Sequence, residues 1–170
     1  TLTPLRLDTE TVAVIPARHL SWQQVQCPAG VLPSPSATDP MGARLRSVLE
    51  GLLEDRLLDE PSALHFALQP PPYNAAGVWV AVCDRAELAL AIQQLAAQGH
   101  GVHRLVPECS PLPEGSTTLW ITGTADTPQA LWADSQGVHL WALPAHAHHA
   151  SAWPAPAQAQ LALAETVQAE

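Results

Sequence analysis

The chain has 170 residues, of which 47% are hydrophobic, so it is long enough to bury the core of one globular domain. Its seven cationic side chains are all Arg and its Asp and Glu side chains number sixteen, which gives a formal charge of −9. Such an acidic surface repels phosphate backbones, which argues against nucleic acid as a partner and favours a basic protein.

The three cysteines, Cys27, Cys83 and Cys109, are widely spaced and form no CxxC pair. This pattern argues against a disulfide framework and a Cys-rich zinc site, so we expect buried thiols in a reducing compartment. No signal peptide is apparent, and no apolar stretch approaches the ~20 residues of a spanning helix. We therefore expect a soluble, cytoplasmic fragment without membrane contact, trimmed from a longer protein because it begins at Thr1 rather than Met.

Two short segments near the start, residues 11–15 and 20–26, are rich in β-branched and apolar residues and are predicted to be strands. Only residues 16–19 separate them, so we expect a hairpin. Residues 28–38 are rich in Pro and Ser, which predicts a loop.

The strongest helix signal follows this loop. Asp39 suits the N-cap and Pro40 the first helical position. Apolar residues then recur at intervals of three and four: Met41, Leu45, Val48, Leu49, Leu52 and Leu53. Pro61 limits the helix, and residues 63–69 are predicted to be a strand.

The middle of the chain predicts a β-α-β unit at about residues 78–106. A strand at 78–83 leads into a helix that Asp84 and Glu87 cap, and Gly99 suits its C-terminal end. The apolar residues of this helix are expected on one face: Leu88, Ala91, Ile92, Leu95 and Ala96. A second strand, at 102–106, is expected to pair in parallel with the first through a right-handed connection.

Three more strands are predicted downstream, at residues 117–122, 129–133 and 138–143. The last two flank a turn in which Gly137 supplies positive φ. The order of elements predicts an α/β domain over residues 1–143, with one mixed sheet and packed helices. Residues 144–170 are rich in Ala, Pro and His, which predicts a disordered tail or a truncated helix.

Candidate catalytic and metal sites are weak in this sequence. There is no GxxxxGK[ST], GxGxxG or GxSxG motif. The tract of His146, His148 and His149 lacks neighbouring carboxylates or thiols, so we interpret it as exposed rather than metal-binding, although its metal binding stays open. Asp8 and Asp126 lie in turn-like contexts near strand ends. We therefore assign no catalytic, cofactor or metal residue.

The tryptophans have two expected environments. Five lie within predicted strands, where a buried position is the default: Trp22, Trp79, Trp120, Trp132 and Trp141. Trp153 lies in the Ala- and Pro-rich tail and is expected to be exposed.

The charged face of the first helix is the best candidate for contact with a basic partner. Acidic residues gather there around two arginines. The predicted partner-binding residues are Arg46, Glu50, Glu54, Asp55 and Arg56.

The ordered set of elements resembles the cytoplasmic domain of type II secretion system protein L, of the general secretion pathway L family. The resemblance begins in residues 12–16 and 20–22 and continues through the helix at 45–57. It is best marked in residues 80–86 and 95–108 and extends over about residues 11–143. The ordered set of segments carries the resemblance, since no single motif in it is diagnostic.

The resemblance implies an actin-like, RNase H-like architecture, present here as a partial domain. It implies a non-catalytic scaffold that recruits the secretion ATPase, beside other platform proteins, to the cytoplasmic side of the inner membrane, and it leaves a homodimer open. Two alternatives stay open. One is an actin-like nucleotide-binding domain of a PilM-like pilus-assembly protein, although the stretch from Asp8 to Glu10 lacks the expected phosphate-loop Gly. The other is a metal-binding or hydrolytic RNase H-like domain.

Overall fold

The computed structural model describes residues 10–33, 42–73, 77–124 and 126–144, together with 155, 158 and 159. The chain divides into two compact units, Thr1–Glu108 and Cys109–Glu170, and the described residues form two sheets in the first unit and one in the second. The composition of the chain predicts a boundary near residue 143 and gives no sign of the division after Glu108. Within the described residues, no helix is both long and apolar enough to cross a bilayer.

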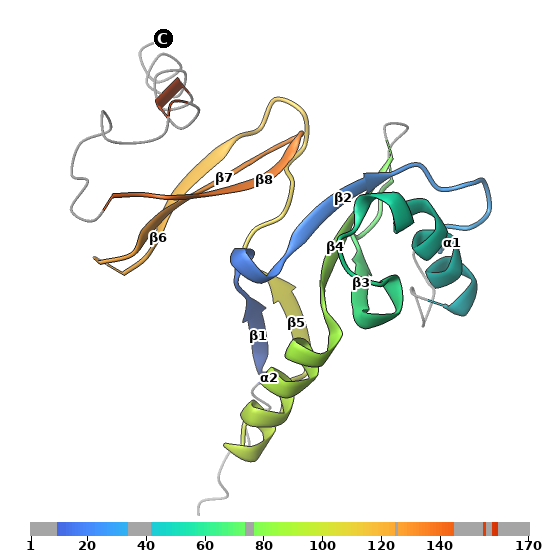
Figure 1. The fold of residues 1–170 in the computed structure, drawn as a ribbon, viewed down its shortest axis with the longest axis horizontal. Coiled ribbons are helices and arrows are strands. Elements are labelled where there is room, and N and C mark those ends of the chain that lie inside the picture. Colours follow the sequence, from blue (N-terminus) through green and yellow to red (C-terminus); the bar gives the residue numbers. More distant parts are fainter. Residues whose placement is uncertain are drawn as a thin grey trace, which may run out of the picture. The chain divides into compact units, whose positions relative to one another are not determined.

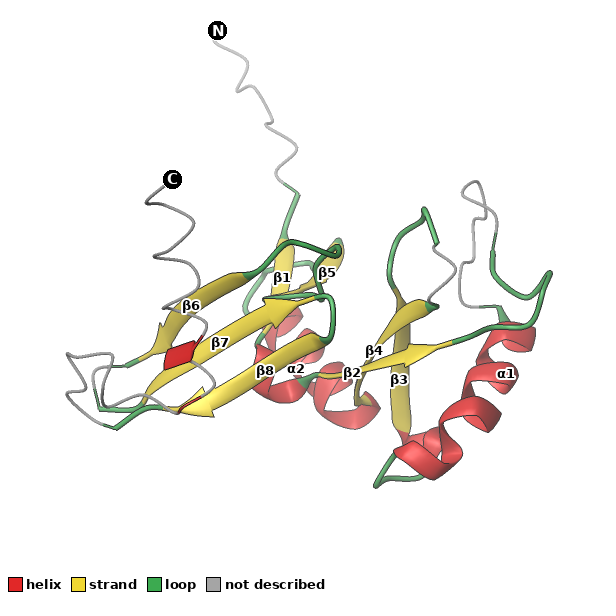
Figure 2. Cartoon of the chain, turned by 90° about the horizontal axis from the view of Figure 1, so that it is seen from above, coloured by secondary structure: helices red, strands yellow, loops and turns green. Residues whose placement is uncertain are grey.

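The core of the first unit is a three-stranded antiparallel sheet covered by one helix. Its strands are β2 (Ser21–Val25), β4 (Val78–Asp84) and β3 (Leu64–Leu68), in the order β2-β4-β3. Helix α1 (Ala43–Leu53) packs on one face of this sheet, as Figure 2 shows. The buried cluster between them consists of Val25, Leu45, Leu49, Leu53, Leu64, Phe66, Val78, Val80 and Val82. Buried residues recur every second position in β4 and every fourth position in α1, so one face of the strand and one face of the helix pack together in a single apolar layer.

Two features of α1 differ from the sequence prediction. Its N-cap is Gly42, which makes no side-chain capping bond, whereas the predicted Asp39 and Pro40 lie outside the described residues. Leu52 is 39% exposed, although the predicted apolar stripe included it. A short 3-10 turn, η2 (Glu54–Arg56), follows the helix, and a second, η3 (Pro61–Ala63), leads into β3.

A second, parallel sheet in the first unit pairs β1 (Val12–Ile15) with β5 (Arg104–Pro107), side by side in Figure 1. The predicted hairpin of residues 11–15 and 20–26 is therefore wrong. The residues between the two strands form a 3-10 turn, η1 (Ala17–His19), and not the tight loop that joins the strands of a hairpin. The strand that follows this turn, β2, belongs to the other sheet of the first unit.

The predicted parallel pairing inside residues 78–106 is also wrong, although all three of its elements exist. Both edges of β4 are occupied, by β2 and β3, so β5 finds its partner in β1 instead. The connecting helix α2 (Arg85–Ala97) is capped as predicted, because the Asp84 Oδ1 accepts a hydrogen bond from the Glu87 N–H at 2.7 Å. Gly99 ends it with a φ of +84°.

The second unit contains a sheet of three consecutive antiparallel strands, as the sequence predicts. These are β6 (Thr118–Gly123), β7 (Pro128–Asp134) and β8 (Gly137–Ala142). The two-residue turn between β7 and β8 ends at Gly137, with a φ of +142°.

Of the five strand tryptophans expected to be buried, only Trp132 is, whereas Trp22, Trp79 and Trp141 are half-buried. Trp132, on the central strand β7, is 4% exposed and donates its indole N–H to the Asp134 Oδ2 at 2.8 Å. Trp120 is 43% exposed, so the expectation that it lies in the core is wrong. It lies on β6, which pairs with β7 and forms one edge of the sheet among the described residues. Trp153 lies outside the described residues.

The fold is thus α/β, but the described residues form three separate sheets rather than the predicted single mixed sheet. One sheet is wholly parallel and the other two are wholly antiparallel. The occupied edges of β4 account for the separation of the two sheets in the first unit, because they leave β4 no edge at which β5 could pair. The third sheet belongs to the second unit.

Candidate protein-interaction site

Arg46 and Glu50, two of the predicted partner-binding residues, hold α1 to the rest of the first unit. The Arg46 Nε lies 2.8 Å from the Glu50 carboxylate, and the two side chains are only 26% and 33% exposed. The Arg46 Nη2 donates to the carbonyl oxygens of Pro61 and Leu64, at 3.3 and 3.2 Å. Its guanidinium also lies 5.3 Å above the centre of the Phe66 ring. Arg46 and Glu50 thus make their polar contacts inside the first unit.

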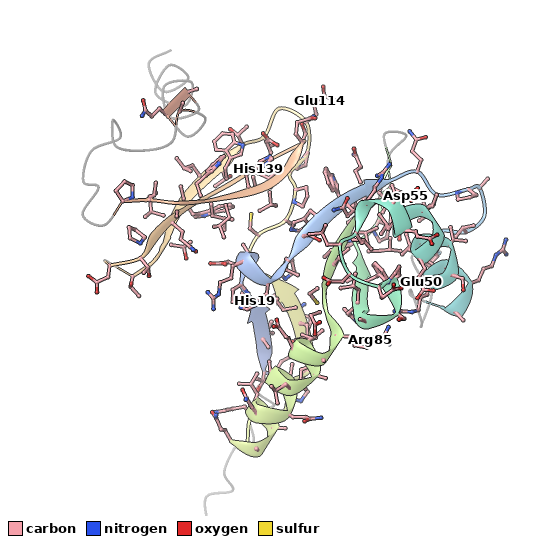
Figure 3. All side chains as sticks on the ribbon, in the orientation of Figure 1. His19, Glu50, Asp55, Arg85, Glu114 and His139 are labelled. Atoms are coloured by element: carbon pink, nitrogen blue, oxygen red, sulfur yellow. The ribbon has the colours of Figure 1, made fainter. Side chains whose placement is uncertain are left out.

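The remaining three predicted residues belong to η2 and are exposed. Arg56 donates to the Gln24 carbonyl oxygen at 2.9 Å and so fastens η2 to β2. Asp55, labelled with Glu50 in Figure 3, and its neighbour Glu54 are exposed carboxylates on the same turn. Among the predicted residues, Glu54 and Asp55 therefore form the most accessible acidic surface, which we call the η2 acidic turn.

A second feature of the first unit is a groove between α2 and the parallel sheet. It encloses a cavity of about 210 Å³, lined mainly by aliphatic side chains of β1, β5 and α2. His19 lies at one end of this groove, where its Nδ1 is 3.5 Å from the Glu87 carboxylate. Figure 3 shows His19 beside the end of β1.

Sequence analysis missed the groove as a feature. Four of the five residues predicted for the apolar face of α2 do line it, namely Leu88, Ala91, Ile92 and Leu95, whereas Ala96 does not. Residues 12–15 are all apolar, so the sequence has no alternation there that would assign one face of the strand to a cavity. In the structure Ala13, Val14 and Ile15 all line it. The predicted hairpin assigned that strand to the wrong neighbour and so concealed the juxtaposition.

The described residues do not assemble a metal site. They contain no group of three or more His, Cys, Asp or Glu side chains placed to hold an ion. Asp84 serves as a helix cap, and Asp126 is exposed in the turn between β6 and β7. The tract of His146, His148 and His149 and the acid Asp8 lie outside the described residues, so the metal-binding question stays open there.

The thiols behave as structural side chains in the described residues. Cys83 and Cys109 are buried, Cys27 is half-buried, and none of the three forms a disulfide. Burial raises the pKa of the Cys83 thiol, and the nearby carboxylates of Asp84 and Glu87 raise it further. Burial likewise raises the pKa of Cys27. A raised pKa keeps both thiols protonated and poorly nucleophilic at neutral pH.

Comparison with known proteins identifies the fold. No family model and no curated protein matches the chain. Among solved structures, the cytoplasmic domain of EpsL, an inner membrane component of the type II secretion system of Vibrio cholerae, matches with a TM-score of 0.55 and 21% sequence identity. This chain has an EpsL-like fold. The match covers 79% of this chain and 51% of EpsL's cytoplasmic domain, so the chain spans about half of that domain.

The EpsL match confirms the resemblance that the sequence predicts, at the level of the fold. The two chains share a mixed α/β organisation over most of the present chain. The actin-like architecture that the resemblance implies stays a prediction, as does the partner-binding role of the five charged residues.

Proposed function

We propose that this chain is a non-catalytic scaffold domain that binds the ATPase of a type II secretion system. In this role it lies on the cytoplasmic side of the bacterial inner membrane, beside other proteins of the inner-membrane platform. The observation that carries the proposal is the EpsL-like fold, since EpsL is an inner membrane component of such a system.

The charge distribution supports a basic protein as the partner. The chain carries a formal charge of −9, and the η2 acidic turn presents Glu54 and Asp55 to solvent. Exposed carboxylates of this kind accelerate association with a positively charged surface and make it sensitive to salt. Arg46, Glu50 and Arg56 are engaged inside the first unit and are better interpreted as the support of this surface.

The test is a binding titration between the whole chain and the N-terminal domain of the cognate secretion ATPase, at low and moderate salt. We expect binding that weakens with salt and that weakens further in the Glu54→Arg/Asp55→Arg variant. The matched control is Glu114→Arg/Asp126→Arg, which reverses two exposed acids in the second unit.

Each outcome addresses a different part of the proposal. Equal loss of binding in both double variants would show a nonspecific effect of net charge. Unchanged binding in the Glu54→Arg/Asp55→Arg variant would keep the function but remove the η2 acidic turn from the interface. Absence of binding by a folded chain at low salt would contradict the proposed ATPase partner.

A further inference from the structure

Helix α2 is apolar but poorly covered. None of its 13 residues is buried, although its sequence contains three leucines, an isoleucine and five alanines. Leu88, Ile92 and Leu95 face the parallel sheet and remain half-buried, because the cavity of about 210 Å³ separates them from it. Apolar side chains around an open cavity remain in contact with water, so their burial by another apolar group would be favourable.

The size of the cavity limits what can enter it. Sites for drug-sized ligands and cofactors are usually about 300–1,000 Å³, so about 210 Å³ suits one or two aliphatic side chains better. Ala13 and Ile15 of β1 and Leu105 of β5 form the wall opposite α2. An aliphatic side chain in this position would contact both walls, as the central anchor of a protein interface does.

The charged groups along the groove lie at one end of it. Its titratable lining residues are His19, Cys83, Asp84 and Glu87. The Glu87 side chain is 71% exposed, and its contact in the described structure is with His19, whose side chain is 44% exposed. Two carboxylates beside an apolar cavity are complementary to a cation that adjoins an apolar side chain.

We propose that the groove formed by β1, β5 and α2 receives an amphipathic helix of a partner protein. A Leu- or Ile-type side chain fills the cavity, and an Arg or Lys one turn away pairs with Glu87 beside Asp84. Residues three or four apart lie on one face of a helix, so an apolar anchor and a cation at that spacing reach both parts of the groove. This inference rests on the proposed function in one respect, that the chain is a protein-docking module.

The test uses a synthetic amphipathic helix with Leu on one face and Arg one turn from the central Leu. It is titrated into the whole isotope-labelled chain, and chemical shifts are followed by NMR. We expect shifts concentrated in β1, β5 and α2, and a fit to one site. A peptide with Glu in place of Arg is expected to bind more than tenfold more weakly, because it places like charges together.

Two variants of α2 locate the site. Ala91 lines the groove, and Ala91→Trp is expected to fill the cavity and weaken peptide binding at least tenfold. The matched control is Ala89→Trp, which introduces the same side chain at an exposed residue of α2 outside the groove lining and is expected to bind as the original chain does. Glu87→Gln is expected to weaken binding about two- to fivefold, the range of an exposed ion pair.

Circular dichroism checks the fold of each variant, and Ala91→Met serves if Ala91→Trp does not fold. The proposal is overturned if the peptide shifts other regions, if it binds equally to the filled groove, or if it does not bind. The ATPase domain of the previous section is then titrated against the same variants. If the peptide binds the original chain but the ATPase domain does not, the proposal that the ATPase is the partner is rejected, and the proposal that the groove binds a helix is kept.

Discussion

Arg46 shows how one charged side chain fixes an element that apolar packing alone would leave adjustable. It joins α1 to η3 through the Pro61 carbonyl oxygen, to the start of β3 through the Leu64 carbonyl oxygen, and to its own helix through Glu50. A planar guanidinium can bond several acceptors in fixed directions, which a Lys ammonium cannot do in the same geometry. Arg46 is therefore better understood as a positioning residue for α1 and for the neighbouring η2 acidic turn.

Replacing Arg46 with Met keeps much of the aliphatic stem but removes every polar contact. We expect Arg46→Met to lower the free energy of unfolding by about 2 kcal/mol, because Glu50 and two carbonyl groups lose a charged donor. Urea unfolding followed by circular dichroism measures the change. Arg44→Met, at an exposed position of the same helix, is the control and is expected to change stability by less than about 0.5 kcal/mol. Equal losses in the two variants would contradict the positioning role.

His65 gives the chain a pH-dependent component of stability. Burial lowers its pKa from the ordinary value of 6.5, and the positive charges of Arg46 and Arg85 lower it further. The folded state therefore prefers the neutral imidazole, and the unfolded state takes up the proton first as the pH falls. This contribution is fully present above pH 6.5 and is lost as the pH falls through the lowered pKa.

The His65→Gln variant is accordingly expected to lose less stability than the original chain between neutral and mildly acidic pH. Urea midpoints measured across that interval test this expectation. His100→Gln, at an exposed site, controls for the loss of an imidazole as such. Parallel pH profiles for the original chain and His65→Gln would show that the burial and the two arginines have no net effect on the stability.

At the scale of elements, the start of β4 depends on a glycine. Gly77 has a φ of +124°, and a Cβ at this position would lie 2.7 Å from the Val25 carbonyl oxygen of β2. An added methyl group would thus separate the two strands where their ladder begins. The conformation and the contact both require Gly here.

Gly77→Ala is expected to destabilise the first unit by about 3 kcal/mol, because it combines backbone strain with a clash against a backbone atom. Gly30→Ala is the matched control. Its φ is +75°, but an added Cβ there meets nothing within 4 Å, so it is expected to lose about 1 kcal/mol from strain alone. Thermal melting of both variants tests the difference, and similar losses would mean that the close approach to β2 relaxes without cost.

Local elements were more predictable than their pairing. Asp84 and Gly99 mark the ends of α2 because capping is decided by residues a few positions apart. The three strands of the second unit were predictable for the same reason, since each pairs with the next in sequence. The pairing of β1 was not, because its partner β5 lies at the other end of the unit and no local pattern specifies it.

The candidate sites divide in the same way. Charge patterning predicts Glu54 and Asp55 as exposed acids, but on the charged face of the first helix, whereas the structure ends that helix at Leu53 and places both acids in η2. The structural role of Arg46 required knowledge of where η3 and β3 lie. The groove required the correct neighbour for β1, which the sequence did not indicate.

At the scale of the whole molecule, ligand-induced stabilisation separates the scaffold from the two alternative functions. A ligand at a hundred times its dissociation constant raises stability by ~2.7 kcal/mol. We expect no change of melting temperature with ATP–Mg²⁺ or with Zn²⁺, because the proposed scaffold acts through protein contacts and requires neither ligand.

Thermal melting with each ligand, and with excess EDTA as the control for Zn²⁺, measures this. Stabilisation by ATP–Mg²⁺ would favour the nucleotide-binding alternative over the scaffold. Stabilisation by Zn²⁺ that EDTA reverses would favour the metal-binding alternative. Its loss on changing His146, His148 and His149 to Ala would locate the ion in that tract.

The pairing of β1 with β5 also sets the order in which the chain can fold. The Thr11 N–H donates a hydrogen bond to the His103 Nδ1 across a separation of 92 residues in the sequence, whereas only two residues separate β7 from β8. Closing so long a loop is entropically costly, and non-local strand pairing slows folding. During synthesis, the segment Val12–Ile15 leaves the ribosome before Arg104–Pro107 does and cannot pair until that later segment has been made. Until that segment is made, Val12–Ile15 is an apolar segment without its native strand partner, which exposes it to non-native strand pairing.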